Sequence, residues 1–267
     1  MFDAIRLYCQ YFRVSVQAQM QYRVSFVLLT LSQFLTTGIE FVAIWALFDR
    51  FGSIKGWTLP EVALFYSLAH IAFAFADALG RGFDRMDQFV RNGELDRLLL
   101  RPRSVALQVA GSELILRRVG RLAQALVVLV WAVGELDVAW SAVKILLLLS
   151  VIGGGTCFFY ALFVLHATLA LWTVESLEIT AAFTYGGVQT AQYPLTIYRP
   201  WFRRFFTVVL PMACVTYFPV LALLEKPDPL GSSEVFQWMA PAGGVLFLAV
   251  ALQIWRIGLK HYTSTGS

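Results

Sequence analysis

The sequence has few charged side chains for its length. Of its 267 residues, only 14% are Asp, Glu, Lys or Arg, whereas 58% are hydrophobic, and the mean hydropathy is +0.67. Soluble domains carry about 25% charged residues, so the composition excludes an ordinary soluble domain and indicates a polytopic membrane protein. The net charge of +4 does not indicate nucleic-acid binding, because most Lys and Arg residues flank apolar runs, as membrane orientation requires.

The sequence also lacks the common motifs of metal sites, nucleotide sites and catalysis. Its three cysteines, Cys9, Cys157 and Cys214, are too scattered for a metal cluster or a disulfide framework. There is no Gly-x-x-x-x-Gly-Lys-Ser/Thr loop to hold ATP phosphates and no His-Glu-x-x-His pair to bind zinc. We therefore expect that the chain is not an enzyme and binds no metal or cofactor itself.

Long apolar runs predict an all-α membrane protein with a single domain over residues 1–267. Crossing the bilayer core takes about 20 apolar residues. The first 22 residues instead place apolar side chains at helical intervals opposite Arg6 and Arg13, which predicts an amphipathic helix in the membrane interface. The expected spans are 24–48, 59–79, 105–133, 141–172, 174–192 and 239–257.

The final third of the sequence permits two topologies. Hydropathy alone makes 205–224 the fifth span, which places Pro211 and Pro219 inside a helix, where each removes a hydrogen bond. The other topology takes 174–192 as the fifth span and 194–224 as a broken re-entrant hairpin on the far side. Irregular backbone at membrane depth must then be covered by protein or line a wet cavity. Both topologies give six spans.

The distribution of positive charge predicts the orientation. In the re-entrant topology, one side holds two-thirds of the 21 Lys and Arg residues. The positive-inside rule then places both termini and the loop between the second and third spans in the cytoplasm. The hydropathy topology would move Arg199, Arg203 and Arg204 to the same side, which would strengthen the rule and so counts against the re-entrant topology.

The loop at 81–104 is strongly charged and amphipathic. It carries six Arg residues against four acidic ones, and Phe83, Met86, Phe89 and Val90 recur at helical spacing. A charged, amphipathic element between two spans predicts contact with something outside the membrane. The alternative is a solvated charge cluster that only sets the topology.

Two acids and several arginines fall in or near the spans. An acid within a span costs about 2.5–3.5 kcal/mol on insertion scales, so it usually faces a partner or a water-filled cavity. Glu40 and Asp77, with Phe41 nearby, could attract a cationic aromatic substrate or carry a proton. The alternatives are that Glu40 pairs within the bundle and that Asp77 lies among the headgroups. We expect Arg117, Arg118 and Arg121 to reach anionic headgroups.

Three motifs resemble those of a known transporter family. They are RNGELDRLLLRP at 91–102, YPLTIY at 193–198 with Arg199, Pro200, Trp201, Pro211 and Pro219 after it, and WRIGLKHY at 255–262. In these motifs, and in its predicted spans, the chain resembles the ABC-2 class of ABC transporter permeases. The match is to the branch formerly designated a domain of unknown function, which includes subunits of viologen-exporter-type systems.

The resemblance implies roles for two stretches of the chain. The 81–104 loop resembles the coupling helix that docks on a separate ATPase subunit, and the residues expected to take part are Asp84, Met86, Phe89, Arg91, Glu94, Asp96 and Arg97. The second motif resembles the extracytoplasmic re-entrant helices that follow the fifth span in these permeases, which is why we favour that topology. The residues that carry this second likeness are Pro194, Pro200, Trp201, Pro211 and Pro219.

The resemblance also implies partners and an activity. Two permease subunits, either related chains or two copies of one, would work with two ATP-binding subunits that hold ATP and Mg²⁺. Such a complex of the bacterial inner membrane exports a hydrophobic or amphipathic substrate, with cations among the candidates, as in multidrug efflux. Glu40, Phe41 and Asp77 are the candidates for its translocation pathway. The competing function is a proton-coupled secondary transporter that uses Glu40 or Asp77.

Overall fold

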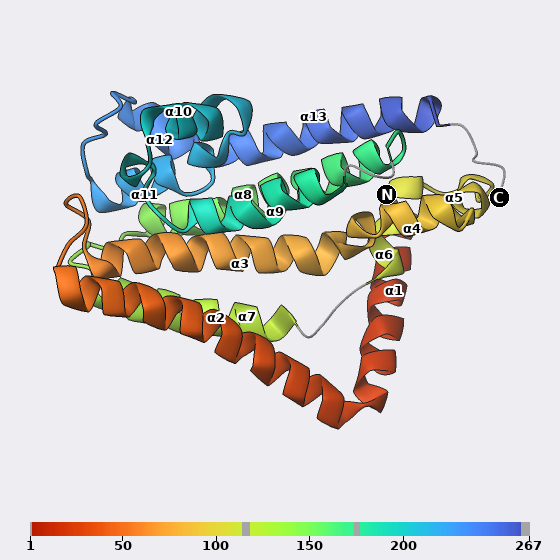
Figure 1. Ribbon diagram of the computed structural model, residues 1–267, viewed down its shortest axis with the longest axis horizontal. Coiled ribbons are helices and arrows are strands. Elements are labelled where there is room, and N and C mark those ends of the chain that lie inside the picture. Colours follow the sequence, from red (N-terminus) through yellow and green to blue (C-terminus); the bar gives the residue numbers. More distant parts are fainter. Residues whose placement is uncertain (1, 114–117, 174–176, 263–267) are drawn as a thin grey trace.

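The computed structural model describes residues 2–113, 118–173 and 177–262, and these ranges are built from helices and their connections. A lone bridge between Ile54 and Trp57 is the only β-pairing within them. The six longest helices after the N-terminal one lie alongside one another (Figure 1). They are α2 (Arg23–Phe51), α3 (Leu59–Asp84), α7 (Val119–Glu135), α8 (Ala142–Ala170), α9 (Leu177–Ala191) and α13 (Pro241–Lys260).

Short helices gather at the two ends of this bundle (Figure 1). One end, here the α4–α6 end, carries α4 (Met86–Arg91), α5 (Glu94–Leu99) and α6 (Val105–Ser112). The opposite end, here the α10–α12 end, carries α10 (Pro200–Arg204), α11 (Tyr217–Leu224) and α12 (Glu234–Met239). Helix α1 (Phe2–Gln21) runs across the bundle axis from α6 to the start of α2, as an interfacial helix would.

Several of these helices are suited to a membrane. Among the described residues, α2, α3 with its continuation to Arg91, α8 and α13 are long and apolar enough to span one. A fifth candidate is the pair Pro200–Val209 and Met212–Leu224, which bends by 79° at its break. The expected spans at 105–133 and 174–192 contain the shorter helices α7, with 17 residues, and α9, with 15. The chain is therefore an all-helical, multi-pass membrane protein.

Helix α3 forms the centre of the bundle. It begins with a capping box in which the Thr58 backbone N–H donates to Glu61 Oε2 at 2.9 Å, and Pro60 occupies its first turn. Every residue from Val62 to Phe73 is buried, because α7, α8 and α9 cover it. A helix that is apolar on all sides is stable only in such a position. Helix α2 instead presents apolar side chains outward, namely Val24, Leu28, Leu35, Ile39 and Val42.

The bounds of three elements differ from the expected ones. Helix α3 continues past 79 to Asp84, and the charged loop folds into α4 and α5, separated at Gly93, whose φ of +66° favours glycine. The expected third span at 105–133 is divided into α6 and α7, and residues 114–117 between them lie outside the described ranges. Residues 174–176 of the expected fifth span and 263–267 also lie outside the described ranges.

Candidate coupling surface and buried polar cluster

The apolar stripe of the charged loop faces the protein's own bundle. Met86, Val90 and Leu95 are buried in the hydrophobic core, and Phe89 is half-buried against it. Short helices have little stability by themselves, so this packing holds α4 and α5 on the end of the bundle. The stripe predicted from the sequence exists, but Met86 does not present its side chain to a partner.

The outer surface of α4 and α5 combines charge with exposed leucine. We define the α4–α5 outer surface as five exposed residues: Arg91, Glu94, Arg97, Leu99 and Leu100. Leu100 is 87% exposed, and its neighbour Leu99 is 42% exposed. Exposed apolar side chains rimmed by charges are typical of protein-interaction sites. Asp96, also predicted to dock, is half-buried.

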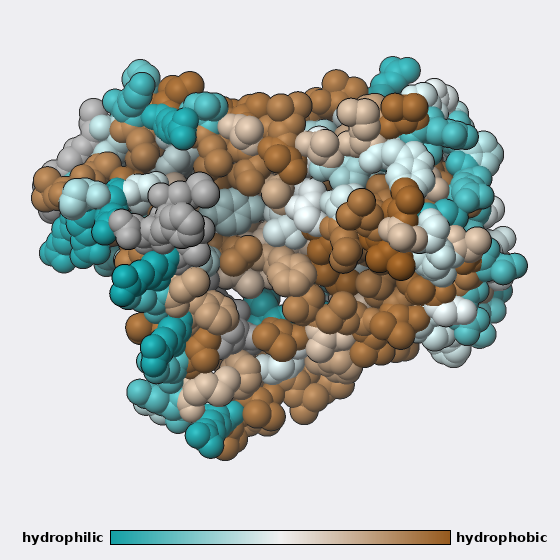
Figure 2. Space-filling view, turned by 180° about the vertical axis from the view of Figure 1, so that it is seen from behind, coloured by the Kyte–Doolittle hydropathy of each residue, from teal (hydrophilic) through white to brown (hydrophobic). Residues whose placement is uncertain are grey.

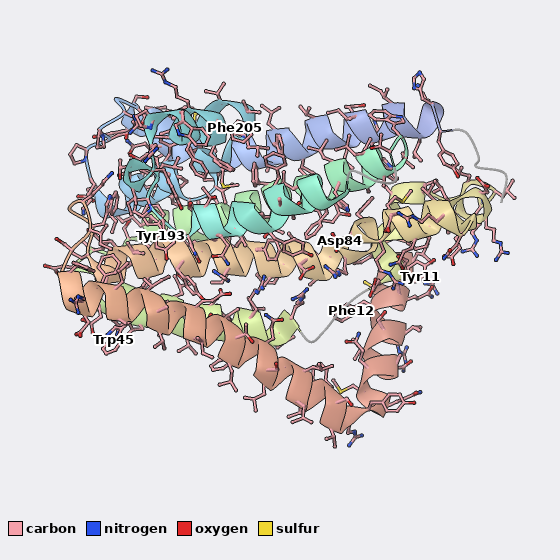
Figure 3. The ribbon with its side chains drawn as sticks, in the orientation of Figure 1. Tyr11, Phe12, Trp45, Asp84, Tyr193 and Phe205 are labelled. Atoms are coloured by element: carbon pink, nitrogen blue, oxygen red, sulfur yellow. The ribbon has the colours of Figure 1, made fainter. Side chains whose placement is uncertain are left out.

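Asp84 lies at the junction of α3 and α4 and contacts the bundle. Its Oδ2 is 2.7 Å from Arg81 Nη1 and accepts a hydrogen bond from the Tyr185 hydroxyl at 3.3 Å. Tyr185 also accepts a hydrogen bond from Arg81 at 2.6 Å. Asp84 Oδ1 is 4.0 Å from His166 Nε2. Asp84, predicted from the sequence as a docking residue, thus connects α3 to α8 and α9 at the α4–α6 end (Figure 3).

Asp77 is fully buried in an ion-pair cluster. Its Oδ2 is 2.6 Å from Arg118 Nε, and its Oδ1 is 3.6 Å from Arg81 Nη1. Arg118 also donates to Gln33 Oε1 of α2 at 3.1 Å. Arg118 therefore pairs within the bundle instead of extending to the headgroups as expected, and Asp77 is enclosed by protein. The need of a buried acid for a counterion was the only sequence signal for this contact.

A second polar group lies deeper along α3. The Tyr66 hydroxyl is 2.8 Å from the Thr37 carbonyl of α2 and 3.2 Å from Gln124 Oε1 of α7. The His70 ring stacks on Tyr66 with centroids 4.1 Å apart, and its Nε2 is 3.2 Å from Gln192 Oε1. These contacts join α2, α3, α7 and the end of α9 inside the apolar bundle.

Glu40 and Arg121 border this polar group, and both carry atoms without partners. Glu40 Oε2 and the Nε and Nη1 of Arg121 are buried without a hydrogen-bond partner. The Arg121 guanidinium lies 5.1 Å from the centre of the Phe73 ring, so Arg121, like Arg118, points into the bundle. Phe41 packs on Tyr66, with centroids 5.3 Å apart, and thus forms part of the α2–α3 contact.

The segment that follows α9 runs along α3 to its far end. Tyr185 contacts Arg81, Gln192 contacts His70, and Thr196 Oγ1 accepts a hydrogen bond from Trp57 Nε1 at 3.0 Å. As the chain advances from residue 185 to residue 196, its contacts move back from residue 81 to residue 57. The two segments are therefore antiparallel. Tyr193 in Figure 3 lies toward the α10–α12 end, as this direction requires.

The prolines predicted for the re-entrant stretch stand at helix starts or in a short helix. Pro194 and Pro211 directly precede the short 3₁₀ helices Leu195–Ile197 and Met212–Cys214, and Pro200 begins α10. A helix start tolerates Pro because its first N–H groups have no helical partner. Pro219 lies in the first turns of α11 and is buried, and Trp201 is 67% exposed.

Three further contacts show where residues 205–226 lie along α9 and α3. The Phe205 ring lies 5.9 Å from the Phe183 ring, two turns inside α9. Thr216 Oγ1 then donates to the carbonyl of Ala191 at 2.9 Å. Lys226 Nζ finally lies 2.6 Å from Glu61 Oε1 in the first turn of α3.

Lysines at the α10–α12 end hold loops together. In addition to the pair with Glu61, the Lys226 ammonium lies 4.6 Å from the centre of a Trp57 ring. Lys144 Nζ is 2.7 Å from Glu225 Oε1, and this hydrogen bond and charge lower the pKa of Glu225. Lys55 donates to the backbone carbonyls of residues 196 and 197. Across the described ranges, no group of three His, Cys, Asp or Glu side chains is placed to hold a metal ion.

The fold is that of a multi-pass helical membrane protein, and sequence comparison identifies its family. A family model described as ABC-2 family transporter protein matches residues 34–266, most of the chain. The chain therefore belongs to the ABC-2 family of transporter proteins, and the resemblance seen in its motifs is confirmed. No curated protein and no solved structure matches the chain significantly.

Proposed function

We propose that the chain is the permease subunit of an ATP-driven exporter in the bacterial inner membrane. It works with a separate subunit that binds ATP and Mg²⁺ and with a second permease, which is a related chain or another copy. Its substrate is a hydrophobic or amphipathic molecule that leaves the cytoplasm. The observation that carries the proposal is the α4–α5 outer surface, which follows α3 without a linker and exposes Leu100 between charged residues.

Six spans are supported by the course of the chain along α3. Because residues 185–196 contact α3 and the loop before it in reverse order, α9 with the residues after it covers the length of α3. Helix α9 alone, at about 1.5 Å per residue, extends about 22 Å. The 3₁₀ turn at 195–197 supplies the rest. We therefore take α2, α3, α7, α8, α9 and α13 as the spans.

The contacts of residues 200–226 support the re-entrant hairpin. Phe205 contacts Phe183, which lies two turns inside α9, whereas Thr216 contacts Ala191 at the end of α9. Lys226 then contacts Glu61 in the first turn of α3, so the chain goes in and comes back out at the same end. A fifth span at 205–224 would instead have to end at the opposite side. With this hairpin outside the cell, the α4–α6 end and both termini are cytoplasmic, as the positive-inside rule predicts.

The junction at Asp84 suggests how ATP binding is coupled to the spans. A displacement of α4 by the ATPase would move the last turn of α3 directly. Asp84 and Arg81 contact Tyr185 of α9, and Asp77 contacts Arg118 at the start of α7. Movement of α3 would thus reach both neighbouring helices through charged contacts and open the pathway at the interface of the two permeases.

The proton-coupled alternative has weaker support in this structure. A proton carrier must bind a proton again after releasing it, and an adjacent positive charge opposes that binding. Asp77 is in contact with Arg118 and near Arg81, so it is suited to a structural ion pair. That leaves Glu40 as the acid available for such a role.

Co-purification with the proteins encoded beside it tests the proposal. The tagged chain is compared with the double variant Glu94→Arg and Leu100→Asp, which changes only exposed side chains of the α4–α5 outer surface. The control is Glu234→Arg, an equally exposed charge reversal on α12 at the opposite end. We expect the wild type and the control to retain an ATPase and the double variant to lose it.

Either of two results would contradict the proposal. A chain that is folded and purifies without any ATPase would favour a secondary transporter, and transport driven by a proton gradient would then establish it. Equal recovery of the ATPase by all three proteins would mean that the α4–α5 outer surface is not the docking site. Asp84 is left unchanged because its replacement would disturb the bundle.

A further inference from the structure

We propose that Glu40 and Arg121 form a substrate-recognition site inside the bundle, and that the site takes an amphoteric aromatic molecule. Such a molecule carries one cationic group, one anionic group and a flat ring. The inference rests on the proposed transport function and names the substrate class. It also gives Arg121 a role in specificity that neither the family membership nor the sequence motifs assign.

The first support is that both side chains have buried polar atoms without partners. An unpaired buried donor or acceptor loses its hydrogen bonds to water and gains none in return, and the loss is larger for charged groups. One carboxylate oxygen of Glu40 and two guanidinium nitrogens of Arg121 are buried without a hydrogen-bond partner. Ionisable residues within a membrane bundle often mark the pathway of a substrate or ion.

The second support is that the two charges lie on neighbouring helices but do not pair. Glu40 is on α2 and Arg121 on α7, which pack together, yet the two side chains form no ion pair. Arg121 is held over the Phe73 ring, and its neighbour Arg118 is already paired with Asp77. A ligand that offers an anion to Arg121 and a cation to Glu40 would satisfy both charges across the gap.

The third support is the aromatic character of the surroundings. Phe41 and Tyr66 pack together beside Glu40, and Phe73 lies under Arg121. Aromatic faces suit a flat ring and stabilise a cation held against them. In the view from behind, the surface between the two ends of the bundle is largely apolar (Figure 2).

A set of indole compounds separates the contributions of the two charges. Free tryptophan carries both charges, tryptamine only the cation and indole-3-propionate only the anion, and all three share one ring. Binding to the chain, purified with whatever subunits accompany it and placed in lipid nanodiscs, is measured by competition against tritiated tryptophan. We expect tryptophan to bind about tenfold or more tightly than either singly charged compound, as one charge-assisted hydrogen bond allows.

Variants assign the preference to the two residues. Arg121→Gln should reduce tryptophan binding to the level of tryptamine and leave tryptamine unchanged. Glu40→Gln should reduce it to the level of indole-3-propionate. Arg121→Lys keeps the charge without the planar fork and should retain part of the preference, which controls for misfolding. Arg85→Gln, an exposed change at the α4–α6 end, should have no effect.

Five results decide the matter. Absence of tryptophan binding up to millimolar concentration, or equal binding of the three compounds, would overturn the proposal. Wild-type binding by the double variant Glu40→Gln and Arg121→Gln would do the same and leave the two residues as a loose structural pair. If the binding pattern holds but no ATPase accompanies the chain, the recognition site stands and the proposed ATP-driven function fails. If an ATPase complex forms but the binding pattern is absent, the proposed ATP-driven function stands and the recognition site fails.

Discussion

Asp77 provides a quantitative test of the packing inside the bundle. The substitution Asp77→Asn removes the charge that neutralises Arg118, which lies 2.6 Å away. Breaking a buried ion pair costs about 3–5 kcal/mol because the remaining charge is left uncompensated. Arg118 keeps its hydrogen bond to Gln33, and Arg81 keeps Asp84 at 2.7 Å, so we expect a loss near 3 kcal/mol.

The assay is thermal stability of the detergent-solubilised protein, followed by size-exclusion chromatography after heating. The double variant Asp77→Leu and Arg118→Met removes both charges and should recover most of the loss, because apolar residues replace buried ion pairs at little cost. The control is Glu113→Gln. Its partner Arg85, at 3.1 Å, is 49% exposed, so water screens the pair and we expect a change within about 1 kcal/mol.

The ranking of these variants can refute the reasoning. If Asp77→Asn and Glu113→Gln lower stability equally, the Asp77 carboxylate is not buried and paired as described. If the double variant is less stable than Asp77→Asn, the pair contributes net stability, and the cost does not arise from an unpaired arginine. Either result would also remove the support that the Asp77–Arg118 contact gives to coupling between α3 and α7.

Two further predictions concern the packing of α8 and the α11–α12 connection. Gly154→Ala should separate α8 from α13 and cost about 1–3 kcal/mol, because a Cβ at this position would collide with the Pro241 carbonyl. The control Gly153→Ala, which has open space around it, should be neutral in the same heating assay. Asp228 is partly buried, which alone would raise its pKa, but hydrogen bonds from Ser232, Leu230 and Tyr217 lower it below the usual 3.8. Its contribution to stability is therefore complete above about pH 4 and is lost as the pH falls through the lowered value. Hydrogen exchange of residues 225–233 should accelerate there, and Asp228→Asn should remove the pH dependence.

Composition and motifs were sufficient to predict the class and family of the protein. The scarcity of charge predicted a membrane protein, and the motifs at 91–102 and 193–198 pointed to the family that the comparison confirms. The amphipathic pattern of the charged loop also predicted short helices with an apolar face. The pattern could not show what that face contacts, and in the structure Met86 packs against the bundle.

The charged contacts inside the bundle were beyond the reach of the sequence. Asp77 and Arg118 are 41 positions apart, and no local pattern pairs them. Arg118 and Arg121 stand just before an apolar run, which is also the arrangement of arginines that reach lipid headgroups. The choice between the two orientations depends on whether a counterion lies opposite, and tertiary packing alone supplies that information.

Helix α3 shows why such contacts are predictable in kind but not in detail. When a helix is covered on every side, each polar residue on it must meet a partner from a neighbouring element. The polar residues of α3 that do so are Glu61, Tyr66, His70, Asp77, Arg81 and Asp84, and their partners come from α2, α7, α8, α9 and the α11–α12 connection. Each of these residues fixes the depth of another segment against α3. The few polar residues of α3 therefore help to determine how the other helices pack against it. Their partners can be identified only from the assembled structure.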